Sequence, residues 1–407
     1  MSQAVLDHVR SRPDLALPAY VTDLPGLSAH AARVRAALPA QLELLYAAKA
    51  NPDPEVLRAL APHFDGVEVA SGGELEHVAA ALPGVALSFG GPGKTEADLE
   101  LAVRSGVHRL HVESRRELDL LARLAARTGR AVDVLLRVNA PLPVPDAPLA
   151  MGGGPSPFGL DPGDLDAAAA AARAAGLRLR GLHLHLASGL NAPACAELAA
   201  AAVAWACAWS VRTGHPLDEL NFGGGMAVDY ANPDARFDWD TYGAALSGLV
   251  RQHPGLRLKV EPGRALTAYG ACYVTRVLDV KRSHGRTFAV VLGGTHHLRT
   301  PAARGHDQPL TVVPSERWPA DLPRPAAPPG PVTLVGQLCT PKDVLARDAP
   351  VPALRAGDVV AFSLAGAYAW NISHTAFLMH PPPAFLYLQP TAGDQPRARR
   401  AGPAAAA

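Results

Sequence analysis

The stretch Glu43–Leu82 reads ELLYAAKANPDPEVLRALAPHFDGVEVASGGELEHVAAAL and contains the same unit twice. Each unit begins with a short apolar run, breaks at glycine, proline or a small polar residue, and continues with apolar residues three and four positions apart. Short apolar runs predict buried strands, and the three-and-four spacing predicts amphipathic helices. Regular alternation of strand and helix is typical of α/β folds built on a parallel sheet.

The alternation continues along the first two-thirds of the chain. The strand-like runs are Glu43–Ala48, Val67–Ala70, Val85–Phe89, Arg109–Val112, Val132–Val138, Arg180–Leu186, Leu217–Phe222 and Arg257–Glu261. The helical patterns between them are Pro54–Leu60, Gly73–Leu82, Thr95–Ser105, Ser114–Thr128, Pro162–Ala175, Ala192–Thr213 and Thr241–Gln252. Eight such strands, each but the last followed by a helix, predict an α/β fold of the (β/α)8 TIM-barrel type, with a doubly wound open sheet as the alternative.

Beyond the eighth run, the pattern changes to strands without long helices between them. These runs are Ala271–Val280, Thr287–Leu292, Leu310–Val313, Val332–Gly336 and Asp358–Phe362. They predict a mostly β domain, and the early segment Asp14–Val21 is expected to pair with it. We therefore expect a barrel over residues 25–265, a β domain over 1–24 and 266–388, and a flexible tail over 389–407.

The composition excludes several classes of protein. The 38 Lys+Arg and 37 Asp+Glu leave a formal net charge of +1, which gives no electrostatic footprint for nucleic acid or an anionic membrane. Hydrophobic residues make up 48%, too many for a disordered chain. Charges or glycines break the apolar runs, so no membrane span is expected, and the N-terminal residues lack the apolar core of a secretion signal. No CxxC pair occurs among Cys195, Cys207, Cys272 and Cys339, so we expect a reduced, cytoplasmic protein without a metal site.

Polar side chains and glycines gather where the predicted strands end. In a barrel, these carboxyl ends form the catalytic face. The residues found there are Lys49, Arg137, His185, Gly223–Gly225, Glu261, Gly263 and Arg264. Taken one at a time, each has an ordinary structural explanation, because a lysine after a strand is usually a solvated surface residue and a glycine triplet is usually a turn.

The glycines after the seventh and eighth strands indicate a phosphate site. These two loops are the recurring phosphate site of barrels, and here they contain Gly223–Gly225 and Gly263 with Arg264. Glycine leaves backbone N–H groups open to an anion. Lys49 closes an apolar run, where partial desolvation would lower the pKa of its amine and favour imine formation. An imine-forming lysine, a phosphate cradle and the carboxylate of Glu261 together suggest pyridoxal 5'-phosphate as the cofactor.

Several stretches of the chain carry a family likeness in their order and spacing. They are Tyr46–Asn51, Phe64–Leu75, His183–Gly189, Asn221–Tyr230, Glu261–Arg264, Gly336–Asp343 and Gly366–Tyr368. Together they make the chain resemble the fold-type III pyridoxal-phosphate decarboxylases, the ornithine, arginine and diaminopimelate decarboxylase family, over about residues 15–388. The resemblance implies an alanine racemase-like barrel, a C-terminal β-barrel domain, and a head-to-tail homodimer with shared active sites.

The resemblance also implies a role for individual residues. Lys49 would form the internal aldimine, Glu261 would contact the pyridine nitrogen, and His185 would stack on the ring. The residues implied to hold the phosphate are Ser188, Gly223, Gly224, Gly225, Gly263, Arg264 and Tyr368. The partner subunit's Cys339 would protonate the carbon that loses CO2. Without the resemblance, this cysteine would be interpreted as a small buried hydrophobe.

Departures from the family pattern bear on the substrate. In the basic amino-acid and diaminopimelate decarboxylases an Asp or Glu that holds a substrate amine follows the catalytic cysteine, whereas this chain has Thr340. Arg299 stands where the diaminopimelate enzymes bind a distal carboxylate, and arginine suits bidentate carboxylate binding. His296, His297 and Lys342 are expected to add positive charge. The predicted substrate-binding residues are Arg299, Thr340, His296 and Arg137.

Two stretches favour one branch of the family. Met151–Leu160 and Cys339–Asp343 are similar to the siderophore-biosynthesis branch, which includes a decarboxylase of a citryl-2,3-diaminopropionate intermediate. A citrate conjugate carries carboxylates, which would suit Thr340 and Arg299. We therefore expect a cytoplasmic, homodimeric carboxy-lyase (EC 4.1.1.-) that acts on a citryl-diamino-acid intermediate, with no nucleic-acid or membrane partner.

Other functions stay open. Diaminopimelate, ornithine, lysine or arginine could be the substrate, although Thr340 disfavours a free diamine. An amino-acid racemase of the same fold would typically have Arg at the pyridine nitrogen, where this chain has Glu261. Non-catalytic pyridoxal-phosphate-binding proteins are usually single barrels, so residues 265–388 argue against that class. An unrelated barrel hydrolase would need a metal or a carboxylate pair that the strand ends do not clearly supply.

Overall fold

The computed structural model describes residues 2–144, 147–389 and 398–400. The chain divides into two compact units, which we call the barrel unit and the β unit. The barrel unit comprises 30–227 and 237–266, and the β unit comprises 1–29, 228–236 and 267–407. The segment 228–236 lies within the range expected for the barrel but groups with the β unit.

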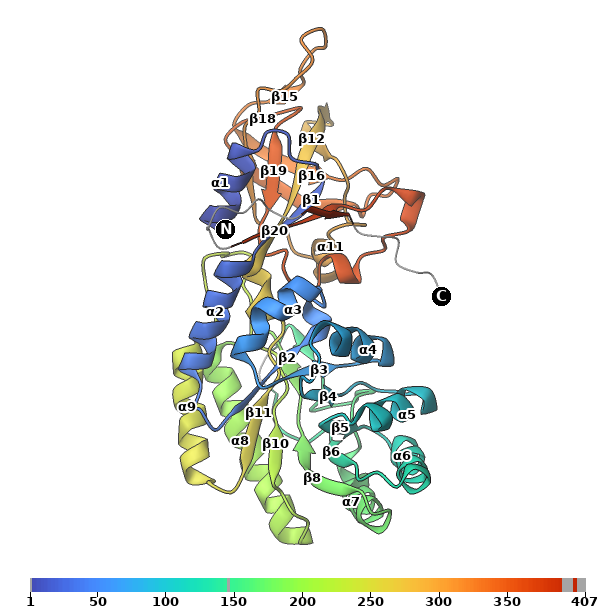
Figure 1. Ribbon diagram of the computed structural model, residues 1–407. Coiled ribbons are helices and arrows are strands. Elements are labelled where there is room, and N and C mark those ends of the chain that lie inside the picture. The colour runs from blue at the N-terminus through green and yellow to red at the C-terminus, as the bar shows by residue number, and fades with distance from the viewer. Residues whose placement is uncertain (1, 145–146, 390–397, 401–407) are drawn as a thin grey trace. The chain divides into compact units, whose positions relative to one another are not determined.

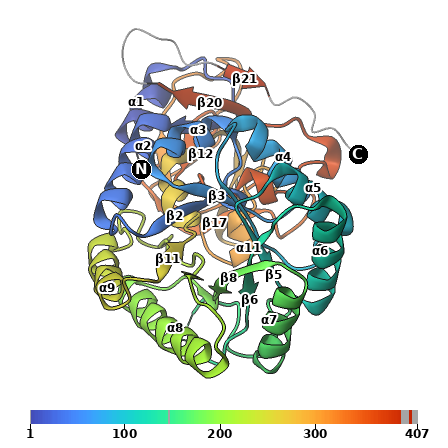
Figure 2. The ribbon, with the colours of Figure 1, turned by 60° about the horizontal axis from the view of Figure 1, so that its bottom comes forward.

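Eight parallel strands close into a barrel, with helices around its outside (Figure 2). In their order around the barrel they are β10 (Glu219–Asn221), β11 (Arg257–Val260), β2 (Glu43–Ala47), β3 (Gly66–Val69), β4 (Leu87–Phe89), β5 (Arg109–Val112), β6 (Asp133–Arg137) and β8 (Arg178–His183). Their residues are almost continuously buried, because a parallel sheet is covered on both faces. The closed barrel confirms the (β/α)8 prediction and excludes the open doubly wound sheet.

Helices precede, connect or follow the strands of the barrel. They are α2 (Leu24–Ala37), α3 (Pro54–Leu60), α4 (Gly72–Ala81), α5 (Glu96–Ser105), α6 (Arg115–Thr128), α7 (Leu165–Ala174), α8 (Ala192–Thr213), α9 (Trp239–Gln252) and α10 (Arg264–Thr267). Shorter elements are η1 (Ala48–Ala50), η2 (Ala61–His63), η3 (Pro162–Asp164), η4 (Ala268–Gly270), β7 (Leu149–Ala150) and β9 (Ala187–Ser188). The side chains of Ser71, Thr95 and Asn191 accept backbone N–H bonds at the starts of α4, α5 and α8, which is why these helices begin where they do.

Helix α8 departs from one expectation. Among the described residues it is the one helix that is long and apolar enough, by length and composition, to cross a membrane, so the prediction that no segment has these properties is wrong. This property is weak evidence for a membrane, because a helix packed in a protein core passes the same test. In the barrel α8 lies beside α9 (Figure 2), and its Val203, Ala206 and Trp209 are buried.

An ionic network closes the amino-terminal end of the barrel. Glu219 on β10 is fully buried and accepts from Arg109 Nε at 2.7 Å and from Lys259 Nζ at 2.9 Å. Lys259 Nζ also donates to Glu43 Oε2 at 2.6 Å, and Arg257 Nη2 donates to Glu219 Oε1 at 2.5 Å. Burial raises the pKa of Glu219, but the bond from Arg109 and the charge of Lys259 outweigh it and lower that pKa to about 2. The network therefore ties β2, β5, β10 and β11 together.

The β unit contains a curled mixed sheet (Figure 1). Its strands are β1 (Ala19–Asp23), β12 (Ala271–Ser283), β13 (Arg286–Val291), β14 (Leu310–Val313), β16 (Gly330–Val335), β17 (Val344–Val351), β19 (Val359–Phe362), β20 (Ala384–Leu388) and β21 (Ala398–Arg400). The main path runs β17-β16-β13-β12-β1-β20-β21, and β19 pairs with both β12 and β14. Strand β1 pairs antiparallel with β12 and parallel with β20, which confirms that the N-terminal segment joins this domain.

Short elements complete the β unit. They are α1 (Gln3–Ser11), α11 (Thr300–Arg304), β15 (Ala326–Ala327), β18 (Leu354–Arg355), η5 (Trp370–Ile372) and η6 (Phe377–Met379). Helix α1 buries Val5 and Val9 in one apolar cluster of the sheet, and Tyr273 and Phe362 belong to a second one. Of the tail expected to be flexible, 390–397 and 401–407 lie outside the described residues, whereas 398–400 form β21.

Candidate active site

A lysine and a buried glutamate form an ion pair where two neighbouring barrel strands end. Lys49 lies in η1, directly after β2, and its Nζ donates to a carboxylate oxygen of Glu68 on β3. The lysine side chain is 44% exposed and the glutamate side chain 5%, so the lysine is partly accessible to solvent while its partner is buried. Burial raises the pKa of Glu68, and this effect is larger than the lowering caused by the positive charge of Lys49. This arrangement presents an accessible amine in a fixed position.

Glu261 lies directly after β11 and is oriented by Asn221. The amide nitrogen of Asn221 donates to Glu261 Oε1 at 2.6 Å, and its amide oxygen accepts from Gly223 N at 2.8 Å. Because the glycine N–H fixes which end of the amide is the oxygen, the amide N–H must face the carboxylate. His183 Nε2 lies 3.5 Å from the other oxygen, Oε2. The carboxylate is therefore buried but well supported, as a group that holds a ring nitrogen should be.

Three histidine rings lie in a row beside this carboxylate. The ring centroids of His111 and His183 are 4.2 Å apart, and those of His183 and His185 are 6.5 Å apart with planes within 3°. Burial lowers the pKa of all three well below the usual value, and nearby charges such as Arg137 add to the effect, so the rings are neutral at pH 7. By spacing alone, His111, His183 and Glu261 could hold a metal ion.

Arg137, predicted to contact the substrate, has partners inside the barrel. It is buried, its Nη1 donates to Glu113 Oε1 at 2.8 Å, and its guanidinium lies 5.0 Å from the ring centroid of Phe158. The other oxygen of Glu113 accepts from Gly159 N at 3.2 Å. The pair therefore anchors the loop after β6, and the substrate role of Arg137 stays a prediction.

The glycine loops come together as expected for a phosphate site. A Cβ added to Gly224 would lie 2.5 Å from the carbonyl oxygen of Glu261, and one added to Gly225 would lie 2.3 Å from that of Ala187. Gly225 has a φ of +104°, a conformation that favours glycine. Within the described part of the chain, the N–H groups of Gly224 and Gly225 have no hydrogen-bond partner. Ser188, on β9, belongs to the adjoining loop, because Gly189 N donates to Gly225 O at 2.7 Å.

The remaining three predicted phosphate residues are placed less directly. Gly263 follows Glu261, and its Cβ position would lie 2.8 Å from Ala50 Cβ, so the loop after β11 packs tightly on η1. Arg264 begins α10. Tyr368 belongs to the β unit and adopts a φ of +49°. Its carbonyl oxygen accepts from Thr300 Oγ1 at 2.5 Å.

The other predicted substrate residues lie on two loops of the β unit that share a buried aspartate. Asp343 accepts from Thr295 N at 2.6 Å, from Thr295 Oγ1 at 2.8 Å and from Leu338 N at 2.8 Å. Gly293 and Gln337 exchange two further hydrogen bonds, at 2.7 and 2.8 Å. The loop that leads to Arg299 and the loop that carries Cys339, the predicted proton donor, are therefore held side by side.

Cys339 and Thr340 lie on the second of these loops. The thiol is exposed and free, so the interpretation of this cysteine as a buried hydrophobe is wrong. Thr340 is half-buried, and its hydroxyl accepts from Lys342 N at 3.3 Å. This position therefore offers a hydroxyl and no charge.

Two of the expected positive charges are absent. Burial, with the neighbouring His380, lowers the pKa of His296 to about 4, and burial with the neighbouring His296 lowers that of His297 to about 3. Both rings are neutral at pH 7, so the expectation that they add positive charge is wrong. Arg299 remains a cation, and its Nη1 lies 2.9 Å from His374 Nδ1.

Sequence reasoning missed four residues of these sites. Glu68, Asn221 and His183 were not among the predicted site residues, and His374 was not considered. The first three are polar residues inside apolar strand runs, within the stretches that carry the family likeness. A polar residue buried in a barrel strand is a usable signal, because it needs a partner. His374 has no such signal in the sequence, because it lies in an irregular segment.

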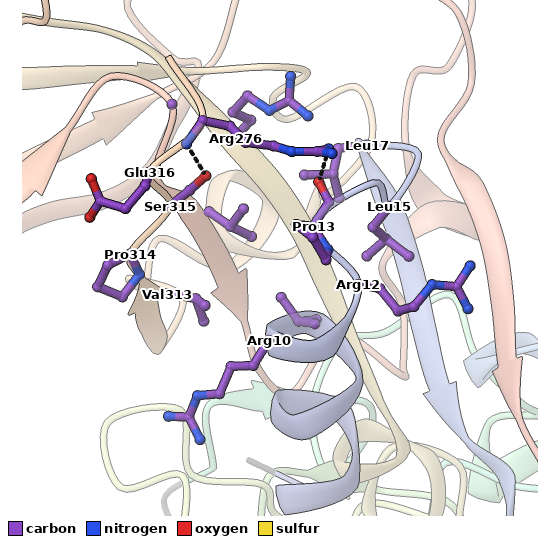
Figure 3. Close-up of a pocket in the computed structure, with 14 residues that line it drawn as sticks. Arg10, Arg12, Pro13, Leu15, Leu17, Arg276, Val313, Pro314, Ser315 and Glu316 are labelled. Atoms are coloured by element: carbon purple, nitrogen blue, oxygen red, sulfur yellow. Dashed lines mark hydrogen bonds between the residues drawn. The ribbon is translucent and has the colours of Figure 1, made fainter.

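A separate pocket of about 660 Å³ lies in the β unit, between α1 and the segment that follows β14 (Figure 3). The carbonyl oxygen of Pro13 accepts from Arg317 Nη1 at 2.6 Å, and Ser315 Oγ accepts from Arg317 N at 3.2 Å. Arginines line its rim, among them Arg10 and Arg276. None of the predicted site residues lines it, so we assign the chemistry to the barrel and not to this pocket.

Comparison with known proteins identifies the family. Residues 25–268 match the model of the family described as pyridoxal-dependent decarboxylase, pyridoxal binding domain. This chain belongs to the pyridoxal-dependent decarboxylases. The decarboxylase is 38% identical to the 2-[(L-alanin-3-ylcarbamoyl)methyl]-2-hydroxybutanedioate decarboxylase of Staphylococcus aureus (strain NCTC 8325 / PS 47), over 92% of this chain and 95% of the relative. It is 34% identical to the diaminopimelate decarboxylase of Actinosynnema pretiosum subsp. auranticum, over 86% of this chain and 79% of the relative.

The fold of the decarboxylase agrees with solved structures. The crystal structure of diaminopimelate decarboxylase from Helicobacter pylori complexed with L-lysine matches it with a TM-score of 0.82 at 24% identity. The match covers 98% of this chain and 95% of that chain. Both the barrel and the curled β domain of the decarboxylase are therefore shared with that enzyme.

The residues at the barrel mouth fit pyridoxal phosphate. The N–H groups of Gly224 and Gly225 are open to a phosphate, and Lys49 offers an amine. His185 has a half-buried ring, and its Nδ1 has no partner among the described residues. The decarboxylase therefore has, in one barrel, the donors that the family's cofactor requires. The individual roles of these residues stay predictions.

Proposed function

We propose that this decarboxylase removes the α-carboxylate of a citryl-diamino-acid conjugate in siderophore biosynthesis. The observation that carries the proposal is the charge of the β-unit loops. Among the described residues, no carboxylate lies within ion-pair distance of Arg299. Thr340 has an uncharged hydroxyl and adds no carboxylate to this loop. A distal ammonium group would meet a cation there, whereas a distal carboxylate would be attracted.

The name of one relative supports the same substrate class. The Staphylococcus aureus enzyme, 38% identical, is named for a 2-hydroxybutanedioate that carries an alanine amide arm. Such a molecule has an amino-acid end that can lose CO2 and a distal end with two carboxylates and a hydroxyl. An uncharged residue at 340 and a cation at 299 suit the distal end of such a molecule.

The chain's own residues divide the chemistry among them. When bound, pyridoxal phosphate supplies a protonated ring that takes up the electrons left by CO2. In the proposal, Lys49 holds the cofactor covalently, and Glu68 positions its amine. Asn221 orients Glu261 to keep a proton on the ring nitrogen, and His185 packs on the ring.

A separate residue returns the proton. We assign this step to Cys339, whose exposed thiol can give a proton to the carbon that has lost CO2. The proposal places this thiol, in a homodimer, at the site of the other subunit. All four cysteines are free, which supports a cytoplasmic location.

A CO2-release screen tests the substrate. The holoenzyme is supplied in turn with the citryl-2,3-diaminopropionate conjugate, diaminopimelate, ornithine, lysine and arginine. The conjugate is expected to give the highest kcat/KM. A strong preference for ornithine or lysine would refute the proposal, and a preference for diaminopimelate would establish the second candidate, since its distal end also carries a carboxylate.

Mixing two inactive variants tests the shared site. Lys49→Ala and Cys339→Ala each destroy one half of a site. Random reassociation of the two homodimers should restore about a quarter of the wild-type activity if the sites are shared, because half of the dimers then carry one intact site of two. Absence of any recovery in a verified mixed dimer would show that each subunit supplies both residues.

A further inference from the structure

We propose that Arg299 and His374 act as one unit that accepts a distal carboxylate of the substrate and rejects an ammonium group, which makes His374 a specificity-determining residue. This inference rests on the proposed function and adds the residue and the physical means by which the acidic end is selected. Both residues belong to the β unit.

The hydrogen bond between the two residues determines what the pair can bind. Arg299 Nη1 lies 2.9 Å from His374 Nδ1. A guanidinium has donors only, so Nδ1 must accept and the ring hydrogen must be on Nε2. Burial and the charge of Arg299 lower the pKa of His374, which keeps the ring in this neutral form at pH 7. The single acceptor of the ring is therefore occupied, and the pair presents donors only.

The backbone around the pair is already fixed. Arg299 N donates to Ser373 Oγ at 3.1 Å, and Ser373 Oγ donates to Ala369 O at 2.6 Å. One residue further on, Thr300 Oγ1 donates to Tyr368 O at 2.5 Å. These bonds attach the segment 368–374 to the start of α11. They therefore fix the backbone of Arg299 and the backbone of His374 relative to each other. A preorganised site loses little entropy when it binds.

Within the described part of the chain, the guanidinium of Arg299 is not neutralised by a paired carboxylate. Among the described residues, no carboxylate forms an ion pair with Arg299. Asp343, whose charge is felt at His374, is already engaged by three donors. His296 is fully buried, and neither of its ring nitrogens has a hydrogen-bond partner among the residues that the structure describes. Its ring centroid lies 4.9 Å from that of His380. A cation with its donors in place and no counter-ion is a site for an anion.

The same donor arrangement explains the rejection of an amine. An ammonium group can only donate hydrogen bonds, and it would find no acceptor on the pair and a positive charge beside it. A carboxylate can accept from the free guanidinium N–H groups and from Nε2–H together. Sites built to make such bonds discriminate strongly against groups that leave them unpaired.

The test uses His374→Ala in the holoenzyme, with kinetics on the citryl conjugate and on ornithine. We expect KM for the conjugate to rise about 10- to 100-fold with kcat nearly unchanged, because one charge-assisted hydrogen bond is lost. Activity with ornithine should stay the same or increase. His374→Gln keeps both an acceptor for Arg299 and an N–H donor, so it should recover part of the affinity.

A binding measurement gives a readout independent of turnover. Citrate itself should bind the wild-type holoenzyme in calorimetry, and its affinity should fall by a similar factor in His374→Ala. The absorbance and retention of the cofactor should not change. His284→Asn is the matched control, because this exposed histidine of the β12–β13 turn has a φ of +48°, which asparagine tolerates, and it should behave as wild type.

The outcomes separate this inference from the proposed function. If wild type prefers the conjugate but His374→Ala keeps its KM and its citrate affinity, the inference alone is overturned. The same holds if the variant loses the cofactor or loses activity equally with ornithine, because the role is then structural. If wild type prefers a free diamine, the proposed function has failed and the inference with it.

Discussion

Replacing Glu219 by Gln should destabilise the barrel unit strongly without touching the catalytic end of the barrel. The substitution keeps the shape of the side chain and removes its charge. Lys259, with a side chain 1% exposed, would keep only Glu43 as a partner. Arg109, 7% exposed, would keep its hydrogen bond to the carbonyl oxygen of His108, but among the described residues the nearest carboxylate left to it would be that of Asp133, at 4.0 Å. Two buried cations would thus lose their main counter-ion.

The magnitude can be obtained in two ways. Between the ordinary pKa of 4.5 and the value of about 2 in the folded protein, the linkage relation gives about 3 kcal/mol at neutral pH for Glu219. Removal of one partner from a buried ion pair costs about 3–5 kcal/mol in other proteins. We therefore expect a loss of about 3 kcal/mol in the free energy of unfolding.

The sign of the pH dependence follows from the lowered pKa. The contribution of Glu219 is complete above its unfolded-state pKa of 4.5 and is lost as the pH falls through about 2. Urea unfolding of wild type and Glu219→Gln measures the difference in the free energy of unfolding. Far-ultraviolet circular dichroism follows the barrel unit, because the long helices that give the signal belong to it. The difference should be full at pH 7 and should shrink steadily below pH 4.5.

An exposed ion pair supplies the control. Glu96 and Arg127 are each 56% exposed and 3.8 Å apart, so Glu96→Gln should change the stability by less than about 0.5 kcal/mol. A loss below about 1 kcal/mol for Glu219→Gln at pH 7 would refute the reasoning. So would a difference between wild type and variant that does not depend on pH.

Three further substitutions test the barrel mouth. Lys49→Ala should abolish CO2 release and let the cofactor leave on gel filtration, because the covalent link is gone; retained turnover would exclude the assignment. Asn221→Ala removes the 2.6 Å bond to Glu261 and should lower kcat/KM about 10- to 100-fold with an unchanged circular dichroism spectrum, so normal kinetics would contradict the orienting role. Gly224→Ala places a Cβ 2.5 Å from a carbonyl oxygen, and it should weaken pyridoxal-phosphate binding in a fluorescence titration at least about tenfold; an unchanged affinity would contradict the role of this loop in holding the phosphate.

Much of the barrel could be predicted because its sequence signals are local. The apolar runs and the glycines at their ends are short patterns, and strand ends fix where chemistry is placed. Strands β17 and β20 were missed for a local reason too. Strand β17 contains charged residues and a positive φ at Asp348, and β20 follows three consecutive prolines. Helix α2 was missed because its apolar face is weakly marked.

The electrostatic part of the site could not be predicted in the same way. His296 and His297 are a pair of basic residues in sequence, but their charge depends on burial and on a third ring, His380, that lies far along the chain. His374 approaches Arg299 only through the folded segment 368–374. Cys339 could be assigned only by its motif, because exposure cannot be read from one residue type.

The aspartate shared by two loops has a consequence for how the specificity of such an enzyme can change. Asp343 leaves no room for a side chain at Gly294 or Gly336, where an added Cβ would lie within 2.6 Å of a carboxylate oxygen. The lengths and paths of both loops are therefore coupled, and an insertion in one would disturb the other. New substrate preferences are more accessible through side chains that do not contact the Asp343 carboxylate, such as those of Arg299 and Thr340. For protein engineering, the two loops are best exchanged between relatives as a single cassette.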